Sequence, residues 1–211
     1  MSTLAATLPE PIIDTMGWYQ RPDEPGLYRR KMSWQEYLDF PSEFKIEWID
    51  GEAISMMAPA NSGHGGIVSN LLFVLRTQIP QLTYRIESGI KVKQGGRIPD
   101  LAIYEKAPAK TEVWIPNPLI LVEVLSPSTR KQDLTTKAAE YSEVGALQYW
   151  IADPKDEWLE IRQAAGDDWL VIARLDANRT EIIVPIPLSG SEASGNNDVR
   201  LVKLSFSEIF Q

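Results

Sequence analysis

The sequence predicts a mixed α/β fold in which a β-sheet core is flanked by helices. Two apolar runs, 98–104 and 119–125, have the composition of strands that are buried on both faces. A third strand-like run, 148–154, follows a segment with amphipathic helical spacing at 133–144. Strand-like and helical segments that alternate without a repeat period are typical of a mixed sheet covered by helices.

The first half of the chain supplies the peripheral elements. Residues 1–30 are irregular and rich in proline, so we expect an extension that packs on the domain or on a partner subunit. Ser33 and Glu36 form a capping-box pattern, which predicts a short helix that Pro41 closes. Apolar runs on both sides of Asp50-Gly51 predict a hairpin over 46–56.

The remaining elements follow in order along the chain. We expect a polar loop at 61–66, a well-buried helix at 67–76, a strand at 84–94, a Gly95-Gly96 turn, the two central strands, the 133–144 helix capped by Gly145, the 148–154 strand, a hairpin of 158–163 with 169–173, an edge strand at 181–184 and a short helix at 205–210. These elements predict an N-terminal extension (1–30), one α/β domain (31–190) and a C-terminal tail with a short helix (191–211).

Composition limits the chemistry that the chain can perform. The chain has no cysteine and one histidine, His64, so a metal would be held by oxygen atoms or by this imidazole, which favours a hard cation. The net charge of -8 argues against an extended basic surface for nucleic acid, although a local basic strip is still compatible with it. No signal peptide or membrane-length apolar run is found, so we expect a cytoplasmic protein with no membrane partner.

Two carboxylates lie in the apolar runs. Glu123 has apolar neighbours on both sides, and an unpaired carboxylate there would cost several kcal/mol, so it needs a cation, a proton or dense hydrogen bonding. Asp100 lies in the preceding strand-like run. Alone, Asp100 would be read as a turn-stabilising residue, and Glu123 could form a salt bridge with a lysine. Together they fit a pair that shares a divalent ion.

Three further residues are candidates for the same site. Lys137 lies four residues after Asp133 and four before Tyr141, which places all three on one helix face. This pattern fits either a surface ion pair or a lysine aimed at the acid pair, because the helix begins close to the carboxyl end of the Glu123 strand. Glu47 could face the site or water. We interpret His64 as a helix cap or a solvated side chain, and the polar loop 126–131 suits phosphate oxygens or water.

These residues carry a family resemblance. The succession resembles the Uma-two family of restriction endonucleases, within the PD-(D/E)XK nuclease superfamily, over about residues 33–185, and it runs Glu47-x-x-Asp50-Gly51-Glu52, His64, Pro99-Asp100, Glu123-Val124-Leu125-Ser126-Pro127-Ser128-Thr129, Asp133-x-x-x-Lys137-x-x-x-Tyr141, Gly145 and Tyr149-Trp150.

The resemblance implies a restriction-endonuclease-like core and a set of roles. Asp100 and Glu123 would hold Mg²⁺ or Mn²⁺, the main-chain carbonyl of Val124 would complete the protein ligands, and Glu47 would be a further ligand or a water-positioning group. The superfamily pattern has a lysine two residues after the glutamate, where this chain has Leu125. The resemblance suggests that Lys137 takes over the role of that lysine.

Three functional hypotheses follow. The first is a metal-dependent endonuclease that hydrolyses DNA phosphodiester bonds. The second is a catalytically weak or inactive nuclease-fold protein that binds a partner or nucleic acid without cutting it. The third is a homodimer whose grooves complete one another, because seven tryptophans and an apolar N-terminal arm leave material for an interface.

Overall fold

The computed structural model describes residues 14–40, 45–56, 62–109, 114–188 and 199–211. The strands in this part of the chain are β1 (Leu27–Lys31), β2 (Ile46–Ile49), β3 (Glu52–Met56), β4 (Thr83–Ile86), β5 (Ile90–Val92), β6 (Gly95–Arg97), β7 (Leu101–Tyr104), β8 (Ile120–Val124), β9 (Gln148–Asp153), β10 (Trp158–Ala165), β11 (Asp168–Leu175), β12 (Glu181–Pro187) and β13 (Val199–Ser205). The helices are α1 (Trp34–Asp39), α2 (Ser62–Gln78), α3 (Arg130–Leu134), α4 (Thr136–Glu143) and α5 (Phe206–Phe210).

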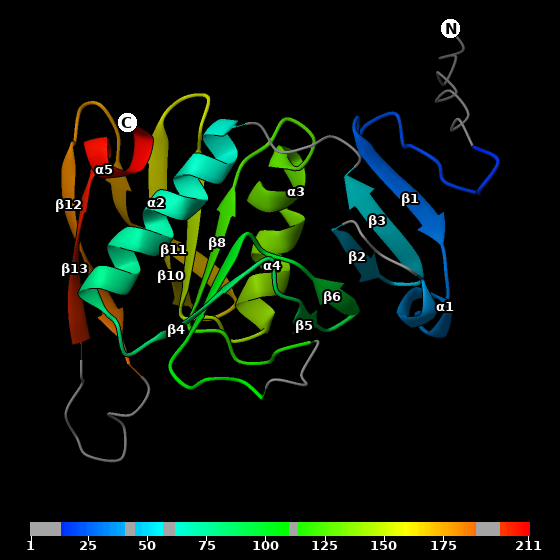
Figure 1. The fold of residues 1–211 in the computed structure, drawn as a ribbon, viewed down its shortest axis with the longest axis horizontal. Coiled ribbons are helices and arrows are strands. Elements are labelled where there is room, and N and C mark those ends of the chain that lie inside the picture. Colours follow the sequence, from blue (N-terminus) through cyan, green and yellow to red (C-terminus); the bar gives the residue numbers. More distant parts are fainter. Residues whose placement is uncertain (1–13, 41–44, 57–61, 110–113, 189–198) are drawn as a thin grey trace, which may run out of the picture.

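A six-stranded mixed sheet forms the centre of the molecule. Its strand order is β11-β10-β9-β8-β7-β4, and β8 and β9 pair in parallel whereas the other neighbours are antiparallel. Every residue of β8 and β9 is buried, as expected for strands that are covered on both faces. A five-stranded sheet, β1-β3-β2-β6-β5, and the β12–β13 pair lie toward opposite ends of the molecule (Figure 1).

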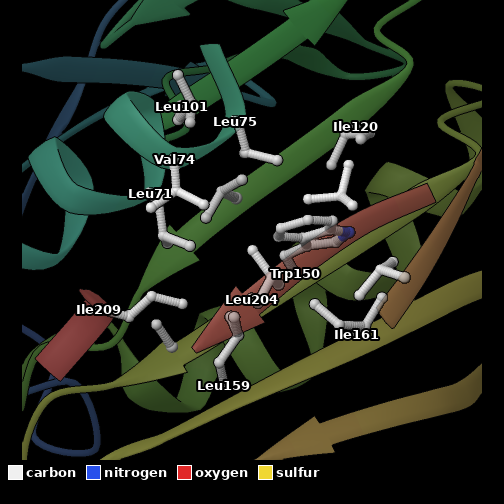
Figure 2. Packing of buried hydrophobic residues seen from close by; sticks show 14 of the residues in the cluster. Leu71, Val74, Leu75, Leu101, Ile120, Trp150, Leu159, Ile161, Leu204 and Ile209 are labelled. Carbon is white, nitrogen blue, oxygen red and sulfur yellow. The ribbon is translucent and has the colours of Figure 1, made fainter. Parts of the chain in front are cut away.

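Different elements cover the two faces of the central sheet. On one face, Leu71 and Leu75 of α2 pack with residues of β7 to β10, β13 and α5, including the fully buried Trp150 (Figure 2). On the other face, Tyr141 of α4 packs against Leu121 and Tyr149. Because side chains alternate along a strand, Glu123 points to the same face as Leu121, toward α4.

The hairpin and the first helix are as predicted. Asp50 and Gly51 both have positive φ angles, 48° and 81°, and connect β2 to β3. Ser33 caps α1 and forms the predicted capping box with Glu36. Pro41, expected to close this helix, lies outside the described residues.

Several predicted elements need correction. The helical segment expected at 133–144 is two helices, because Thr135 leaves helical geometry with φ -125° and ψ -81°. The polar loop expected at 61–66 is helical from Ser62 onward, and residue 61 is not described. This helix, α2, is less buried than expected, since Phe73 is 72% exposed.

The strand expected at 84–94 is divided between two sheets. β4 belongs to the central sheet and β5 to the five-stranded sheet, with Glu87 at a positive φ of 47° between them. Gly95 and Gly96 lie in β6 rather than in a turn. A Cβ on Gly96 would lie 2.1 Å from the Trp114 ring, so close packing requires this glycine.

Two further strands lie where no strand was expected. β1 adds to the edge of β3 from within the predicted N-terminal extension, and β13 pairs with β12 from within the predicted tail. The predicted β10–β11 hairpin and the C-terminal helix are confirmed. Among the described residues, no helix is both long enough and apolar enough to cross a membrane.

Candidate active site

Asp100 and Glu123 lie on neighbouring strands of the central sheet. Asp100 immediately precedes β7, and Glu123 lies within β8, which pairs with β7. The Val124 amide donates a 2.8 Å hydrogen bond to Asp100 Oδ2, so the backbone of β8 fixes the Asp100 carboxylate beside the Glu123 strand. Both side chains are buried.

Glu123 is bound by two groups from α4. Lys137 Nζ and the Tyr141 hydroxyl donate to Glu123 Oε1 at 3.0 and 2.6 Å. The i, i+4 spacing of these donors places both on the helix face that covers β8. The lysine of the predicted helix therefore points at the acid, rather than into solvent.

Lys137 contacts three carboxylates. Its Nζ lies 3.0 Å from Glu123 Oε1, 3.0 Å from Asp133 Oδ1 and 3.5 Å from Glu47 Oε1. The contact with Asp133 lacks hydrogen-bond geometry, and both carboxylate oxygens of Asp133 are buried without a hydrogen-bond partner in the described structure. The Lys137 side chain is 4% exposed, so it acts as the buried counter-charge of this cluster.

Asp100 has a different set of partners. Lys45 Nζ lies 2.7 Å from Asp100 Oδ1, and His64 Nε2 lies 3.2 Å from Asp100 Oδ2. Our interpretation of His64 as a cap or a solvated side chain is wrong. His64 lies in the first turn of α2, and its imidazole contacts Asp100. The sequence signal for this role is that a single histidine can act as a ligand. The polar, glycine-rich segment around it favoured a solvated side chain instead.

Glu47 faces the cluster rather than water. Arg97 Nη1 and the Ile98 amide donate to its two oxygens at 2.8 and 3.0 Å. The same guanidinium binds Glu140 of α4 through two hydrogen bonds. Sequence reasoning missed Lys45 and Arg97. Lys45 could have been found from its position two residues before Glu47, which places both on one side of an extended chain.

The pKa values of the acids diverge. Burial opposes ionisation of Glu47, yet Lys137 and Arg97 lower its pKa to about 2. Burial raises the pKa of Glu123 to about 8; Lys137 opposes this shift, while Asp133 and Asp100 reinforce it. Burial likewise raises the pKa of Asp133. Although burial acts against it, His64 and Lys45 hold the pKa of Asp100 below its usual range.

The cluster contains more carboxyl groups than fixed cations. Its carboxylates are Glu47, Asp100, Glu123, Asp133 and Glu140, and its fixed cations are Lys45, Arg97 and Lys137. Because burial raises the pKa of Glu123 to about 8, a divalent cation that bound Glu123 at neutral pH would displace its proton.

The donor chemistry also fits a hard cation. The acids offer oxygen atoms, and the Asp133 carboxylate is ion-paired with Lys137 but accepts no hydrogen bond among the described residues. In the described part of the chain, no three His, Asp or Glu side chains are grouped as a ready-made metal site. A cation at Asp100 and Glu123 would therefore have to compete with the lysine ammonium groups already bound there.

Little open space surrounds these groups. A cavity of about 20 Å³ is lined by residues that include Leu27 of β1, Lys45, Glu47, Thr129 and Lys137. This volume is enough for about one water molecule. Substrate contact with Glu123 or Lys137 therefore requires movement of the surrounding chain.

A comparison with protein families identifies the group to which this sequence is related. The model of the family Uma2, described as "putative restriction endonuclease", matches residues 34–191. The chain belongs to the Uma2 family. This confirms the resemblance inferred from the motifs, and Glu47, Asp100, Glu123 and Lys137 all lie within the matched range.

A solved structure shares the fold of this Uma2 protein. It is the crystal structure of a "putative nuclease belonging to DUF820" from Anabaena variabilis, with a TM-score of 0.61 and 20% sequence identity over 83% of this chain and 96% of the other. The similarity confirms the predicted α/β fold class. A search of curated proteins found no significant match.

Proposed function

We propose that this Uma2 protein is a metal-dependent endonuclease that hydrolyses DNA phosphodiester bonds. The observation that carries the proposal is the pairing of Asp100 and Glu123 on neighbouring strands, inside a cluster with more carboxylates than fixed cations. Membership of a family described as restriction endonucleases supports the reaction class and makes DNA the expected substrate.

The carboxylates of Asp100 and Glu123 and the main-chain carbonyl of Val124 would hold Mg²⁺ or Mn²⁺. When bound, such an ion polarises a phosphoryl oxygen and lowers the pKa of a coordinated water. Glu47 would serve as a further ligand or would position water, because Arg97 and the Ile98 amide fix its carboxylate.

The other residues of the cluster would preserve the geometry of the two ligands. Lys137 and Tyr141 orient the Glu123 carboxylate, and the Val124 amide and His64 orient that of Asp100. Lys137 would also stabilise negative charge on the phosphate, in place of a lysine at the position of Leu125. Such preorganised groups stabilise a transition state without having to reorient during the reaction.

A second candidate function has an observation in its favour. Leu125 is buried in the core on the α4 face, and three carboxylates surround Lys137. If Lys137 stays bound to these three carboxylates, it cannot take the phosphate-stabilising role that the family resemblance suggests for it. The protein would then bind nucleic acid or a partner through a nuclease fold without cutting.

Two measurements distinguish these functions. Isothermal titration with Mg²⁺ or Mn²⁺ tests for the metal site, and nicking of a supercoiled plasmid in the same buffer tests for hydrolysis. Asp100→Asn is the control, because it removes a ligand charge while keeping the shape of the side chain. Metal binding with nicking that Asp100→Asn abolishes supports the endonuclease, whereas metal binding without nicking favours the binding protein.

A further inference from the structure

Lys45 is a second lysine at the acid pair, and its surroundings differ from those of Lys137. It lies immediately before β2, and its Nζ is 2.7 Å from Asp100 Oδ1. Its side chain is 18% exposed, against 4% for Lys137. Both lysines line the same small cavity. Lys45 is therefore the more accessible of the two ammonium groups beside the acids.

The two lysines also differ in how firmly they are held. Lys137 has carboxylates at 3.0, 3.0 and 3.5 Å, so its transfer to a phosphate would leave three buried acids without their common counter-charge. Lys45 makes one carboxylate contact among the described residues, with Asp100. If a metal ion neutralised Asp100, the Lys45 ammonium would lose its partner and could contact another anion.

We propose that Lys45 occupies the cation position on Asp100 in the metal-free protein and contacts a phosphate of the nucleic acid once metal is bound. This assignment rests on the proposed nuclease function. It gives Lys45 two separate effects: it competes with metal for Asp100 when DNA is absent, and it contributes a phosphate contact when DNA is present.

Loss of Lys45 should therefore change metal affinity and DNA affinity in opposite directions. A purely structural salt bridge would not produce this result. Replacing Lys45 by glutamine removes the competing charge, so metal should bind more tightly to the DNA-free protein. The same change removes a phosphate contact, so DNA should bind less tightly and with a weaker salt dependence, since each phosphate contact contributes close to one unit to the slope of log K against log salt.

The experiment compares the parent with Lys45→Gln, Lys45→Arg and Lys203→Gln. Lys203 is an exposed lysine on β13 that pairs with Glu181, so it controls for the loss of one positive charge. Mn²⁺ affinity is measured by calorimetry without DNA. Affinity for a fluorescent 20-base-pair duplex is then measured in Ca²⁺ over a range of salt concentrations, and a thermal melt confirms that each variant is folded.

We expect Lys45→Gln to bind Mn²⁺ about fivefold more tightly, a size typical of losing one partly exposed ion pair. Its DNA affinity should fall about tenfold and its salt slope by about one, because one phosphate contact is lost. Lys45→Arg should retain most of the parental DNA affinity and salt slope. Lys203→Gln should match the parent in both measurements.

Two results would overturn the assignment of Lys45 without overturning the proposed function. Unchanged or weaker Mn²⁺ binding in Lys45→Gln would show that Lys45 only supports Asp100, and an unchanged salt slope would show that it does not touch phosphate. Both leave the proposed function in place if the parent binds metal and nicks plasmid. A parent that binds no Mn²⁺ would instead overturn the metal-dependent function, and the assignment with it.

Discussion

At the scale of single residues, Lys137 has the greatest effect on the charge balance of the site. Lys137 is buried beside three acids, and methionine, whose unbranched side chain is one atom shorter, removes its charge while filling most of the same space. We expect Lys137→Met to lower the free energy of unfolding by about 3–5 kcal/mol, as when one partner of a buried ion pair is removed. Urea denaturation at pH 7 measures this change.

The matched control for Lys137→Met is Lys203→Met, which removes the same charge from an exposed pair on β13. Its unfolding midpoint should stay close to that of the parent, because exposed ion pairs contribute little. Equal midpoints for the two variants would mean that Lys137 is not the counter-charge of the buried acids.

Glu47 and Glu123 should affect the pH dependence of stability in opposite directions. The pKa of Glu47 is lowered to about 2, so its contribution is present above its unfolded pKa and is lost as the pH falls from about 5 toward 2. The pKa of Glu123 is raised to about 8, so its contribution is present below its unfolded pKa and is lost as the pH rises from about 4.5 to 8.

Glutamine variants test these signs, because glutamine resembles the protonated acid. Between pH 5 and pH 8 in EDTA, Glu123→Gln should gain stability relative to the parent, with a slope of up to about 1.4 kcal/mol per pH unit. Glu47→Gln should lose stability at pH 7 and approach the parent as the pH falls below 4. A Glu123→Gln variant that loses stability as the pH rises would show that its pairing with Lys137 outweighs burial.

The sequence identified part of this cluster for clear physical reasons. Asp100 and Glu123 were found because a carboxylate in an apolar strand is costly, and Lys137 because helical spacing aligns it with Asp133 and Tyr141. His64 and Lys45 reach Asp100 from distant segments. Such contacts depend on how the two sheets and α2 pack together, and local patterns carry no information on this.

At the scale of elements, the residue before β1 packs closely against Ser128 in the loop after β8. Gly26 has a φ of +85°, and a Cβ at this position would lie 2.9 Å from Ser128 Cβ. Gly17 has a similar φ of +83°, but a Cβ there would meet nothing within 4 Å. A comparison of the two glycines therefore separates backbone strain from steric overlap with Ser128.

We expect Gly17→Ala to cost about 1–2 kcal/mol, because alanine is strained at positive φ. Gly26→Ala should cost about 1–3 kcal/mol more, since it also pushes β1 away from Ser128. Chemical denaturation of both variants checks the difference. Equal costs would mean that β1 does not depend on this contact for its position over the site.

The elements that the sequence predicted well are those with local signals. The capping box of α1, the Asp50-Gly51 turn and the Gly145 cap each depend on residues within one turn. β1 and β13 were missed because each pairs with a strand whose position is set by the tertiary fold. The break at Thr135 was missed because the apolar spacing continues across it.

At the scale of the whole molecule, metal binding should appear as global stabilisation. The net charge is -8, and the buried cluster has more carboxylates than fixed cations, so a divalent cation bound in the native cluster reduces repulsion that unfolding would otherwise relieve. A ligand that binds only the folded state at 100 times its Kd stabilises it by about 2.7 kcal/mol.

For a chain of this length, such stabilisation by Mn²⁺ should raise the Tm by about 5–10 °C relative to EDTA. Asp100→Asn should abolish the shift, because it removes a charged ligand from the cluster. Asp176→Asn, which removes a carboxylate paired with Arg174 outside the cluster, should retain it. Differential scanning calorimetry measures all three proteins under the same conditions. If the parent shows no shift at saturating Mn²⁺, the lysine ammonium groups already neutralise Asp100 and Glu123 too well for metal to enter, and the protein that binds without cutting becomes the preferred function.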